Sequence, residues 1–539
     1  MKLNHLIYEN RDLWEAKSYN VSTYDRAKVI TNTHENPEWI HFGAGNIFRS
    51  FQANIAEELL ERGLIETGII AVEGYDLEII DSSYTPCDNL GIYVKLNANG
   101  EIEKRVIGSV TESLKMASGE KDLERIEEIF AKASLKMASF TITEKGYALS
   151  NNKGEMFTFI QADIDNGPTK VNSYMGHIAK LLYHRYLNGA HPLALVSMDN
   201  CSHNGDKLKH AMLTIIKCWC EKGYCEEGFY DYVANGEKIT FPCTMIDKIT
   251  PRPDEAILDI LKKDGLEDIE IKRTAKSTFI SSFVNAEECQ YLVIEDDFPN
   301  GKIPFDNEGV YYTDLETVNK VEKMKVCTCL NPLHTSLAVY GCLLGFKRIF
   351  DEMQDATLSK MVNVLGYEEG LKVVARPKIM EPKEFLTDVI AKRLVNPFMP
   401  DTPQRIACDT SQKIAIRFGE TIKSYAASDE LDVNDLKIVP LVLAGWCRYL
   451  MGVDDNGNEF EISPDPSATN LIEYFSSVKL GQDLDAHIVL KDILNRKEIF
   501  GSDLYEIGLA KQVEDYFYEL TRGVGSVRKT LNKYIDCEE

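Results

Sequence analysis

The 539-residue chain lacks long hydrophobic runs. No uncharged apolar stretch reaches the ~20 residues that a membrane-spanning helix needs, which excludes an integral membrane protein built on helices. The N-terminal residues, MKLNHLIYENRDLWEAK, contain no basic region followed by an apolar core, so we expect no secretory signal. The expected location is therefore the cytoplasm.

The chain contains fewer basic than acidic residues. The chain has 60 Lys and Arg against 85 Asp and Glu, which gives a formal net charge of −25. A surface this acidic argues against nucleic acid or an anionic membrane as the partner. A small molecule is the expected ligand, and an anionic one needs a local cluster of basic groups.

Metal-binding motifs are missing as well. The 13 cysteines include a C-W-C at Cys218–Cys220 and a C-T-C at Cys327–Cys329, but neither is followed by a second pair at ligand spacing. There is no H-E-x-x-H. An odd number of cysteines in a long chain favours reduced thiols. We therefore predict no metal site and interpret the cysteines as small buried hydrophobes.

What the sequence does contain is a change of pattern partway along the chain. From about Trp39 to about Asp297, apolar runs of four to six residues alternate with amphipathic stretches, which predicts a parallel sheet covered by helices on both faces. Helical periodicity dominates from Pro332 onward. We predict an α/β domain over residues 1–320, with a polar N-terminal leader, and a mainly helical domain over residues 321–539.

The segment WIHFGAGNIFRSFQ has the pattern of a dinucleotide-binding turn. A predicted strand is followed by a G-x-G and an amphipathic helix, so the backbone can approach a pyrophosphate at the helix N-terminus. Phe48 replaces the third glycine of the usual fingerprint, and a plain strand–turn–helix connection is the alternative. The candidate cofactor-binding residues are Gly43, Gly45, Asn46 and Arg49, whose charge can reach a phosphate.

Polar residues end three later strands of the predicted sheet. Glu73 ends GIIAVE, and a carboxylate there can accept hydrogen bonds from the adenosine ribose, which favours NAD over NADP. Thr143 and Glu144 follow one further strand, and Asp199 and Asn200 follow another. Ligands bind beyond the carboxyl ends of parallel strands, so these groups can converge on one crevice. A solvated loop acid is the alternative for Glu73, and a turn residue for Asn200.

A helix that is apolar nearly all round is predicted over residues 332–350, and polar groups surround its start. Pro332 suits the first helical position, which makes Asn331 the natural N-cap and explains it without catalysis. Lys325 and His334 lie nearby at the predicted domain junction. Burial favours the neutral amine of a lysine, which suits Lys325 to proton exchange near neutrality.

Two basic residues eight positions apart, Arg405 and Lys413, lie in the segment NPFMPDTPQRIACDTSQKIAIR. They can flank a site for hydroxyl groups or for a carboxylate. A solvated basic face is the alternative when the segment stands alone.

Taken together, these segments resemble the polyol-specific long-chain dehydrogenases, the mannitol dehydrogenase family. Eight collinear blocks carry the resemblance: HFGAGNIFR, TITEKGY, VSMDNCSHNGD, FPCTMIDKITP, YLVIEDDFPNG, CLNPLHTSLAVYG, RIACDTSQK and GWCRYLMGVDDNG. The resemblance implies a Rossmann-type N-terminal domain and a helical C-terminal domain, as in the 6-phosphogluconate dehydrogenase-like fold. It also implies metal-independent hydride transfer with NAD at the domain junction.

The resemblance further implies roles for the site residues. Lys325, just before the L-N-x-x-H motif, is implied to be the general acid/base, and Asn200 and Asn331 are implied to bind the reacting oxygen. Three residues are implied to hold substrate hydroxyls or a carboxylate: His334, Arg405 and Lys413.

One spacing departs from the family. The family lysine lies five residues before the asparagine, whereas Val326 occupies that position here and Lys325 lies six residues before Asn331. A one-residue bulge would restore the geometry. Without one, Lys323 is the fallback.

Fructuronate, the ketone of a sugar acid, is the leading substrate, because TITEKGY, FPCTMIDKITP, VIED and GWCRYLMGVDDNG look closest to the fructuronate reductase branch of the family. Reversible reduction to mannonate with NADH is the expected reaction. Interconversion of fructose and mannitol is the alternative, and a catalytically silent NAD-binding sensor is an alternative of another class. We expect a monomer or a weak oligomer.

Overall fold

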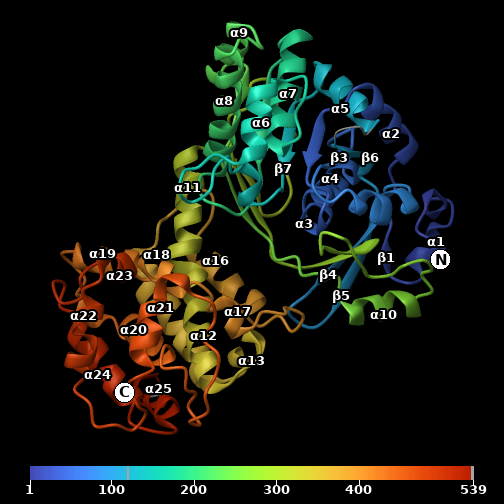
Figure 1. Cartoon of the computed structure of the whole chain (residues 1–539). Coiled ribbons are helices and arrows are strands. Elements are labelled where there is room, and N and C mark those ends of the chain that lie inside the picture. Colours follow the sequence, from blue (N-terminus) through green and yellow to red (C-terminus); the bar gives the residue numbers. More distant parts are fainter. Residues whose placement is uncertain (118–120, 536–539) are drawn as a thin grey trace. The chain divides into compact units, whose positions relative to one another are not determined.

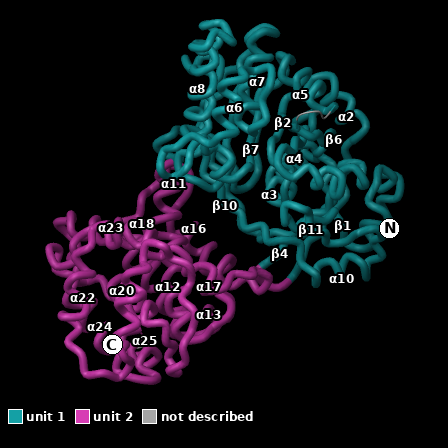
Figure 2. Tube along the Cα trace, viewed as in Figure 1, with its two compact units in different colours: residues 1–97, 101–318 teal, residues 98–100, 319–539 magenta. Residues whose placement is uncertain are grey.

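The computed structural model describes residues 1–117 and 121–535 and divides into two compact units (Figures 1 and 2). The first unit comprises Met1–Asn97 and Glu101–Val318, and the second comprises Ala98–Gly100 and Asn319–Glu539. Within the described residues, no helix combines the length and the apolar character needed to cross a membrane.

A six-stranded parallel sheet forms the centre of the first unit. Counted along the chain, its strands lie in the order 3-2-1-4-5-6, which is the order of the Rossmann fold. The predicted Rossmann-type sheet is therefore confirmed. In spatial order the strands are β6 (Val110–Lys115), β3 (Ile69–Glu73), β2 (Trp39–Phe42), β7 (Met137–Phe140), β8 (Leu193–Ser197) and β9 (Ile239–Thr240).

Helices cover both faces of this sheet, and its central strands are buried throughout. Ile40 and Phe42 of β2 belong to a core cluster with α5, α7 and α8, whereas Trp39 belongs to a second cluster with α4. The helices of this unit are α1 (Arg11–Glu15), α2 (Arg26–Glu35), α3 (Asn46–Ser50), α4 (Gln52–Glu61), α5 (Asp122–Ala131), α6 (Thr158–Asn166), α7 (Tyr174–Leu187), α8 (Asn204–Glu221), α9 (Glu227–Ala234) and α10 (Glu255–Lys263).

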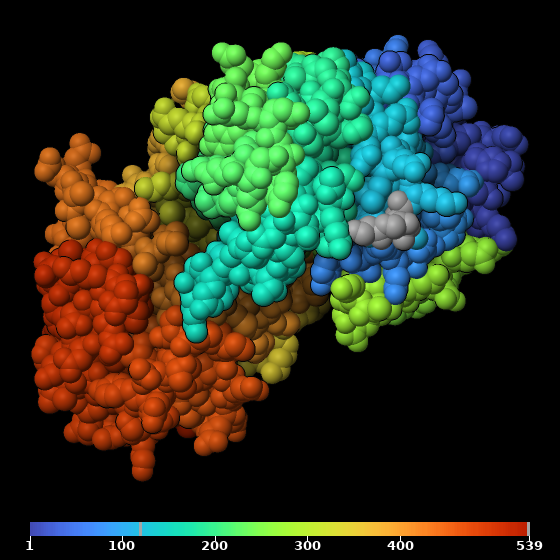
Figure 3. Space-filling view, turned by 45° about the horizontal axis from the view of Figure 1, so that its top comes forward, coloured from blue at the N-terminus to red at the C-terminus, as the bar shows by residue number. Residues whose placement is uncertain are grey.

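Three smaller sheets add to the first unit and have no counterpart in the sequence-based prediction. The N-terminal residues, darkest blue in Figure 3, lie at the surface of this unit, and their strand β1 joins one of these sheets. The sheets are β1 (Tyr19–Asn20), β5 (Ile102–Ile107), β4 (Gly91–Leu96) and β13 (Phe283–Glu287); β10 (Thr244–Asp247), β14 (Tyr291–Glu295) and β15 (Val310–Thr313); and β11 (Lys272–Arg273) with β12 (Phe279–Ile280).

The second unit is mainly helical, as predicted. The buried helix expected over residues 332–350 is shorter than predicted, because Gly345, at φ +79°, ends it in a left-handed cap. Its helical segments are α11 (Leu315–Met324, which begins in the first unit), η5 (Lys325–Cys329), α12 (Asn331–Leu344), α13 (Ile349–Met353), α14 (Ala356–Asn363), η6 (Val364–Gly370), α15 (Leu371–Val373), α16 (Pro382–Asp388), η7 (Val389–Arg393), α17 (Pro403–Ile406), α18 (Ile414–Arg417), α19 (Gly419–Ala426), α20 (Ile438–Tyr449), α21 (Thr469–Phe475), α22 (Ala486–Leu494), α23 (Lys497–Phe500), α24 (Ala510–Leu520) and α25 (Ser526–Ile535).

The block GWCRYLMGVDDNG stabilises the packing of this unit. Gly445 lets α20 approach α12, because a Cβ on it would lie 2.8 Å from the ring of Tyr340. Asp455 caps α25 by accepting hydrogen bonds from the backbone N–H groups of Val527 at 2.8 Å and Arg528 at 3.0 Å. The block therefore has a structural explanation that needs no ligand.

Candidate active site

Two glycines shape the turn that follows β2. Gly43 has φ +106°, and a Cβ on it would lie 2.2 Å from the carbonyl oxygen of Thr141, so only glycine fits. Gly45 stands directly before α3, and a Cβ on it would meet no atom within 4 Å. No side chain among the described residues caps the start of α3. The turn leaves open space beside a helix N-terminus, which suits a phosphate group.

Glu73 holds this turn in place. Its Oε2 accepts a hydrogen bond from the N–H of Ala44 at 3.0 Å, and its Oε1 accepts from those of Tyr75 at 2.8 Å and Asp76 at 3.1 Å. Burial raises the pKa of Glu73 above its ordinary value, although these three hydrogen bonds oppose the shift. The predicted contact with a ribose gains no support, because the carboxylate is buried and both oxygens are engaged.

Arg49 does not present its charge to a phosphate, and that prediction is corrected. Its guanidinium is buried, donates from Nη1 to the carbonyl of Ser281 at 2.6 Å, and lies over the ring of Tyr84. Burial lowers the pKa of Arg49. Asn46, by contrast, remains at the start of α3, where its Nδ2 donates to the carbonyl of Phe279 at 3.0 Å.

Asp199 ties together the ends of β7 and β8. Its carboxylate accepts hydrogen bonds from the N–H groups of Ile142 at 2.9 Å and Thr143 at 2.8 Å, and from the Tyr147 hydroxyl at 2.5 Å. Asn200 follows directly and is exposed. The structure therefore brings the predicted residues Thr143 and Asn200 to adjacent strand ends, as expected for a parallel sheet.

The loop after β7 carries backbone strain. Thr143 has φ +66°, a region that non-glycine residues seldom occupy and that is common at ligand-binding sites. Glu144 follows it, and its carboxylate pairs with the Lys207 ammonium of α8 at 2.6 Å. Both of these predicted residues lie on the exposed side of the strand ends.

Lys325 opens the π-helical turn η5, between α11 and α12. The N–H of Leu330 donates to the Lys325 carbonyl at 3.1 Å, an i to i+5 bond that holds one more residue than an α-helical turn. Lys325 itself is buried, at 5 % exposure. The bulge that its six-residue spacing from Asn331 requires is therefore present. Single π turns of this kind occur often at functional sites.

The fallback residue, Lys323, lies in a different environment. Its side chain is 55 % exposed, and its ammonium pairs with Glu420 Oε2 at 3.1 Å. A solvated, paired lysine is a weak candidate for proton transfer. The structure therefore favours Lys325 over Lys323.

Asn331 is not the N-cap that the sequence predicts. Leu330 occupies the N-cap, α12 begins at Asn331, and no side chain among the described residues caps this helix. The π turn runs directly into α12, so backbone bonds such as His334 N–H to Leu330 O, at 3.1 Å, replace a side-chain cap. Among the described residues, the Asn331 side chain forms no hydrogen bond, which leaves its amide available to a ligand.

His334 lies in a basic cluster of the second unit. Burial is the main cause that lowers the pKa of His334 to about 4. The carboxylate of Asp401 opposes this shift, and the guanidinium groups of Arg393, Arg417 and Arg405 strengthen it. The imidazole is therefore neutral at physiological pH and can donate or accept a hydrogen bond.

Arg405 and Lys413 are both engaged within this cluster. The Arg405 guanidinium pairs with the carboxylate of Asp401, four residues earlier. The Lys413 ammonium donates to the carbonyl of Cys408 at 2.6 Å, and its pKa is lowered by burial and by the neighbouring charge of Arg417. The structure therefore gathers the predicted residues His334, Arg405 and Lys413 in one unit.

Two arginines of the cluster are absent from the sequence-based prediction. Arg417 lies four residues after Lys413, one helical turn away, and that spacing was a usable signal. Arg393, at the end of η7, carries no signal that separates it from other basic residues of the chain.

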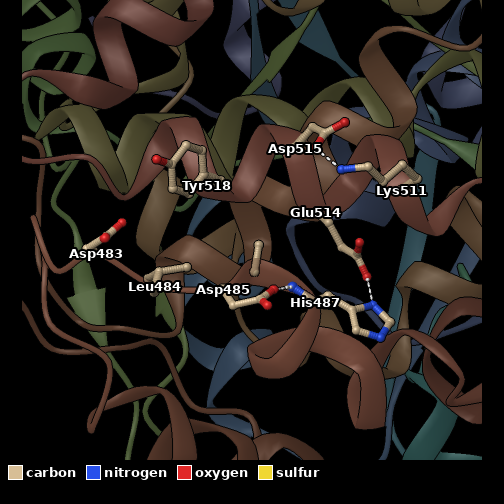
Figure 4. A pocket seen from close by; sticks show the side chains of 9 residues that line it. Asp483, Leu484, Asp485, His487, Lys511, Glu514, Asp515 and Tyr518 are labelled. Atoms are coloured by element: carbon tan, nitrogen blue, oxygen red, sulfur yellow. Dashed lines mark hydrogen bonds and ion pairs between the residues drawn. The ribbon is translucent and has the colours of Figure 1, made fainter.

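A surface pocket of about 490 Å³ in the same unit contains none of the predicted residues (Figure 4). In this pocket Glu514 Oε1 accepts from His487 Nδ1 at 2.8 Å, and the Lys511 ammonium pairs with Asp515. These four charged or titratable groups satisfy one another, which gives the pocket no evident part in the chemistry.

A doubly wound dinucleotide-type domain and a helical domain with a buried lysine and a basic cluster define a two-domain oxidoreductase. The chain belongs to the mannitol dehydrogenase family: residues 37–307 match the mannitol dehydrogenase Rossmann domain, and residues 317–521 match the mannitol dehydrogenase C-terminal domain.

Similar proteins include D-mannonate oxidoreductase of Thermotoga maritima, 49% identical over 541 residues, with 100% of both chains covered. D-mannonate oxidoreductase of Escherichia coli is 28% identical, covering 86% of this chain and 89% of that protein. Pseudomonas fluorescens mannitol 2-dehydrogenase, solved in ternary complex with NAD and D-mannitol, matches with a TM-score of 0.69 and 25% identity over 100% of both chains. A substrate-free D-sorbitol dehydrogenase shares the fold, with a TM-score of 0.76 at 23% identity over 95% of this chain and 97% of its own.

Proposed function

We propose that the protein is an NAD-dependent oxidoreductase that interconverts fructuronate and D-mannonate. The observation that carries the proposal is the 49% identity, over the full length of both chains, to the D-mannonate oxidoreductase of Thermotoga maritima. Mannitol 2-dehydrogenases reach 26–28% identity. A cytoplasmic monomer or weak oligomer that acts on a small sugar acid is part of the proposal.

The basic cluster of the second unit supports an acidic substrate. The charges of three arginines and of one carboxylate, that of Asp401, act on His334, in a chain whose formal net charge is −25. Lys413 adds a further positive charge beside one of these arginines, Arg417. A local positive field attracts a carboxylate, whereas a neutral polyol has no need of one.

The chemistry assigned to the chain's own residues is proton transfer and stabilisation of charge on oxygen. When bound, NADH supplies the hydride for reduction, and NAD accepts it for oxidation. As the carbonyl oxygen gains negative charge, Lys325 delivers a proton to it, and in oxidation the same amine takes that proton back. The Asn331 amide donates a hydrogen bond that strengthens as the charge grows. Asn200, which directly follows Asp199 after β8, is the proposed second donor.

The residues of the β2 turn fit the pyrophosphate of NAD. Open space lies where a Cβ of Gly45 would point, beside the start of α3. We expect Gly45→Ala to raise the dissociation constant of NADH at least about tenfold, while the melting temperature stays within about 1 °C. Gly43→Ala should lower both affinity and stability, because its Cβ would clash with Thr141. Fluorescence titration with NADH measures the affinity. An unchanged dissociation constant in Gly45→Ala would contradict the assignment of the cofactor to this turn.

The activity itself is tested by following NADH at 340 nm. Purified protein is assayed with fructuronate, tagaturonate, fructose and fructose 6-phosphate, and with mannonate and mannitol plus NAD for the reverse reaction. Fast turnover of fructuronate and mannonate alone supports the proposal. A preference for fructose and mannitol replaces the substrate but keeps the assigned residues, and silence on every substrate despite NADH binding points to a sensor.

A further inference from the structure

Arg417 is a partly buried cation with little to compensate its charge. Its Nη1 donates a hydrogen bond to the hydroxyl of Thr335 at 2.5 Å, and among the described residues it pairs with no carboxylate. Burial alone lowers the pKa of Arg417 to about 10. Burying an unpaired charge is unfavourable, so a guanidinium in this state is complementary to an anion that arrives from outside the chain.

Two arginines that are fully buried, Arg185 and Arg448, are satisfied in a different way. The guanidinium of Arg185 donates to five backbone carbonyls, and that of Arg448 donates to three. Within the described residues, the Arg417 guanidinium has one acceptor, the Thr335 hydroxyl. Those of its nitrogen atoms that lack a hydrogen-bond partner are not enclosed by protein. Its remaining donors are therefore open to a ligand.

Arg417 rests on the helical turn that carries two candidate site residues. The Thr335 hydroxyl that accepts from Arg417 donates in turn to the backbone carbonyl of Asn331 at 2.9 Å. The charge of Arg417 is one of those that lower the pKa of the neighbouring His334. Arg417 therefore belongs to the same surface as the L-N-x-x-H motif, although the sequence-based prediction does not include it.

The two cations predicted to hold a carboxylate each have a partner within the chain. Arg405 is paired with Asp401, and the ammonium of Lys413 is bound to the carbonyl of Cys408. Lys413 lies one helical turn before Arg417, whose N–H donates to the Lys413 carbonyl at 2.9 Å. Of these three cations, Arg417 is the one whose side chain has neither a carboxylate nor a carbonyl partner among the described residues.

We propose that Arg417 binds the carboxylate of the sugar-acid substrate and selects sugar acids over neutral polyols. This assignment rests on the proposed function. A planar guanidinium presents two parallel N–H groups that match the two oxygens of a carboxylate. Arg405 and Lys413 are then left to hydrogen-bond with substrate hydroxyls.

The test compares the binding of an acid and its uncharged analogue. Isothermal titration of the full-length protein with D-mannonate and with mannitol is performed for wild type, Arg417→Met and Arg417→Lys, with the exposed Arg522→Met as the matched control. We expect Arg417→Met to weaken mannonate binding about 100-fold and to leave mannitol binding within about threefold. Arg417→Lys should fall between the two, because a lysine keeps the charge but not the fork. The control should match the wild type.

Three outcomes overturn the proposal: equal loss for the acid and the polyol, undiminished mannonate binding, or wild type that binds the two alike. If Arg417→Met does not fold, Arg417→Lys decides, since a loss confined to mannonate supports the assignment and no loss refutes it. Binding is measured without turnover. Wild-type protein that binds mannonate through Arg417 but fails to oxidise it would therefore count against the proposed function alone.

Discussion

Replacing Lys325 with alanine is expected to lower turnover of the substrate by about a thousandfold or more, while NADH affinity stays within about threefold. General acid–base catalysis by a positioned side chain contributes about 10² to 10⁴ in rate. Lys325 is buried and is assigned to proton transfer, whereas the turn at Gly45 is the part of the chain assigned to the pyrophosphate of NAD. Its loss should therefore affect the chemical step and spare cofactor binding.

The matched control is Lys323→Ala, two residues earlier. Lys323 is exposed and pairs with Glu420, and we expect its variant to keep turnover within about twofold of wild type. Single-turnover kinetics at saturating NADH separate the chemical step from product release. Turnover of Lys325→Ala within about tenfold of wild type, which corresponds to about 1.4 kcal/mol of activation barrier, would contradict the assignment of proton transfer to Lys325.

The central sheet could be predicted because its signal is local. Short apolar runs alternate with amphipathic stretches, and each strand of a parallel sheet is buried on both faces. The smaller sheets could not be predicted, because their partners are distant in sequence. Strand β4, at Gly91–Leu96, pairs with β13, at Phe283–Glu287, and no local pattern specifies that pairing.

The candidate site residues also divide into those that a local sequence pattern predicts and those that depend on contacts distant in sequence. The spacing from Lys325 to Asn331 requires a bulge, and the π turn provides it. Glu73 and Arg49 occupy the right segments, but tertiary contacts turn both side chains toward backbone groups, and a sequence pattern does not reveal such contacts. The N-cap prediction for Asn331 was wrong because it assumed an isolated helix start, whereas the chain enters α12 from another helical turn.

Replacing Glu352 with glutamine is expected to stabilise the protein by an amount that grows with pH. Glu352 lies in α13 at 0 % exposure, and neither of its carboxyl oxygens has a hydrogen-bond partner within the described residues. It packs against Gly341 of α12, where a Cβ would lie 2.0 Å from Oε1. Burial, reinforced by the charges of Asp351 and Asp355, raises the pKa of Glu352 from its ordinary 4.5 to about 9.

The direction of the effect follows from the proton that the folded chain retains. Between pH 4.5 and about pH 9 the folded protein holds a proton on Glu352 that the unfolded chain has lost. The contribution of protonated Glu352 to the free energy of unfolding is present in full below pH 4.5 and is lost as the pH rises toward 9. Each pH unit corresponds to 1.36 kcal/mol, so the loss in free energy of unfolding near pH 7 is about 3 kcal/mol. Glutamine does not ionise, so the variant escapes this loss.

Melting temperatures of wild type, Glu352→Gln and the exposed control Glu498→Gln, measured from pH 5 to pH 9, test the prediction. Glu352→Gln should match wild type near pH 5 and exceed it by several degrees at pH 8, while the control follows wild type throughout. A difference between Glu352→Gln and wild type that stays constant with pH would mean that Glu352 has the same pKa in both states. That result would require a hydrogen-bonding partner for the carboxylate inside the folded unit, since an ionised carboxylate at this depth is otherwise too costly to bury.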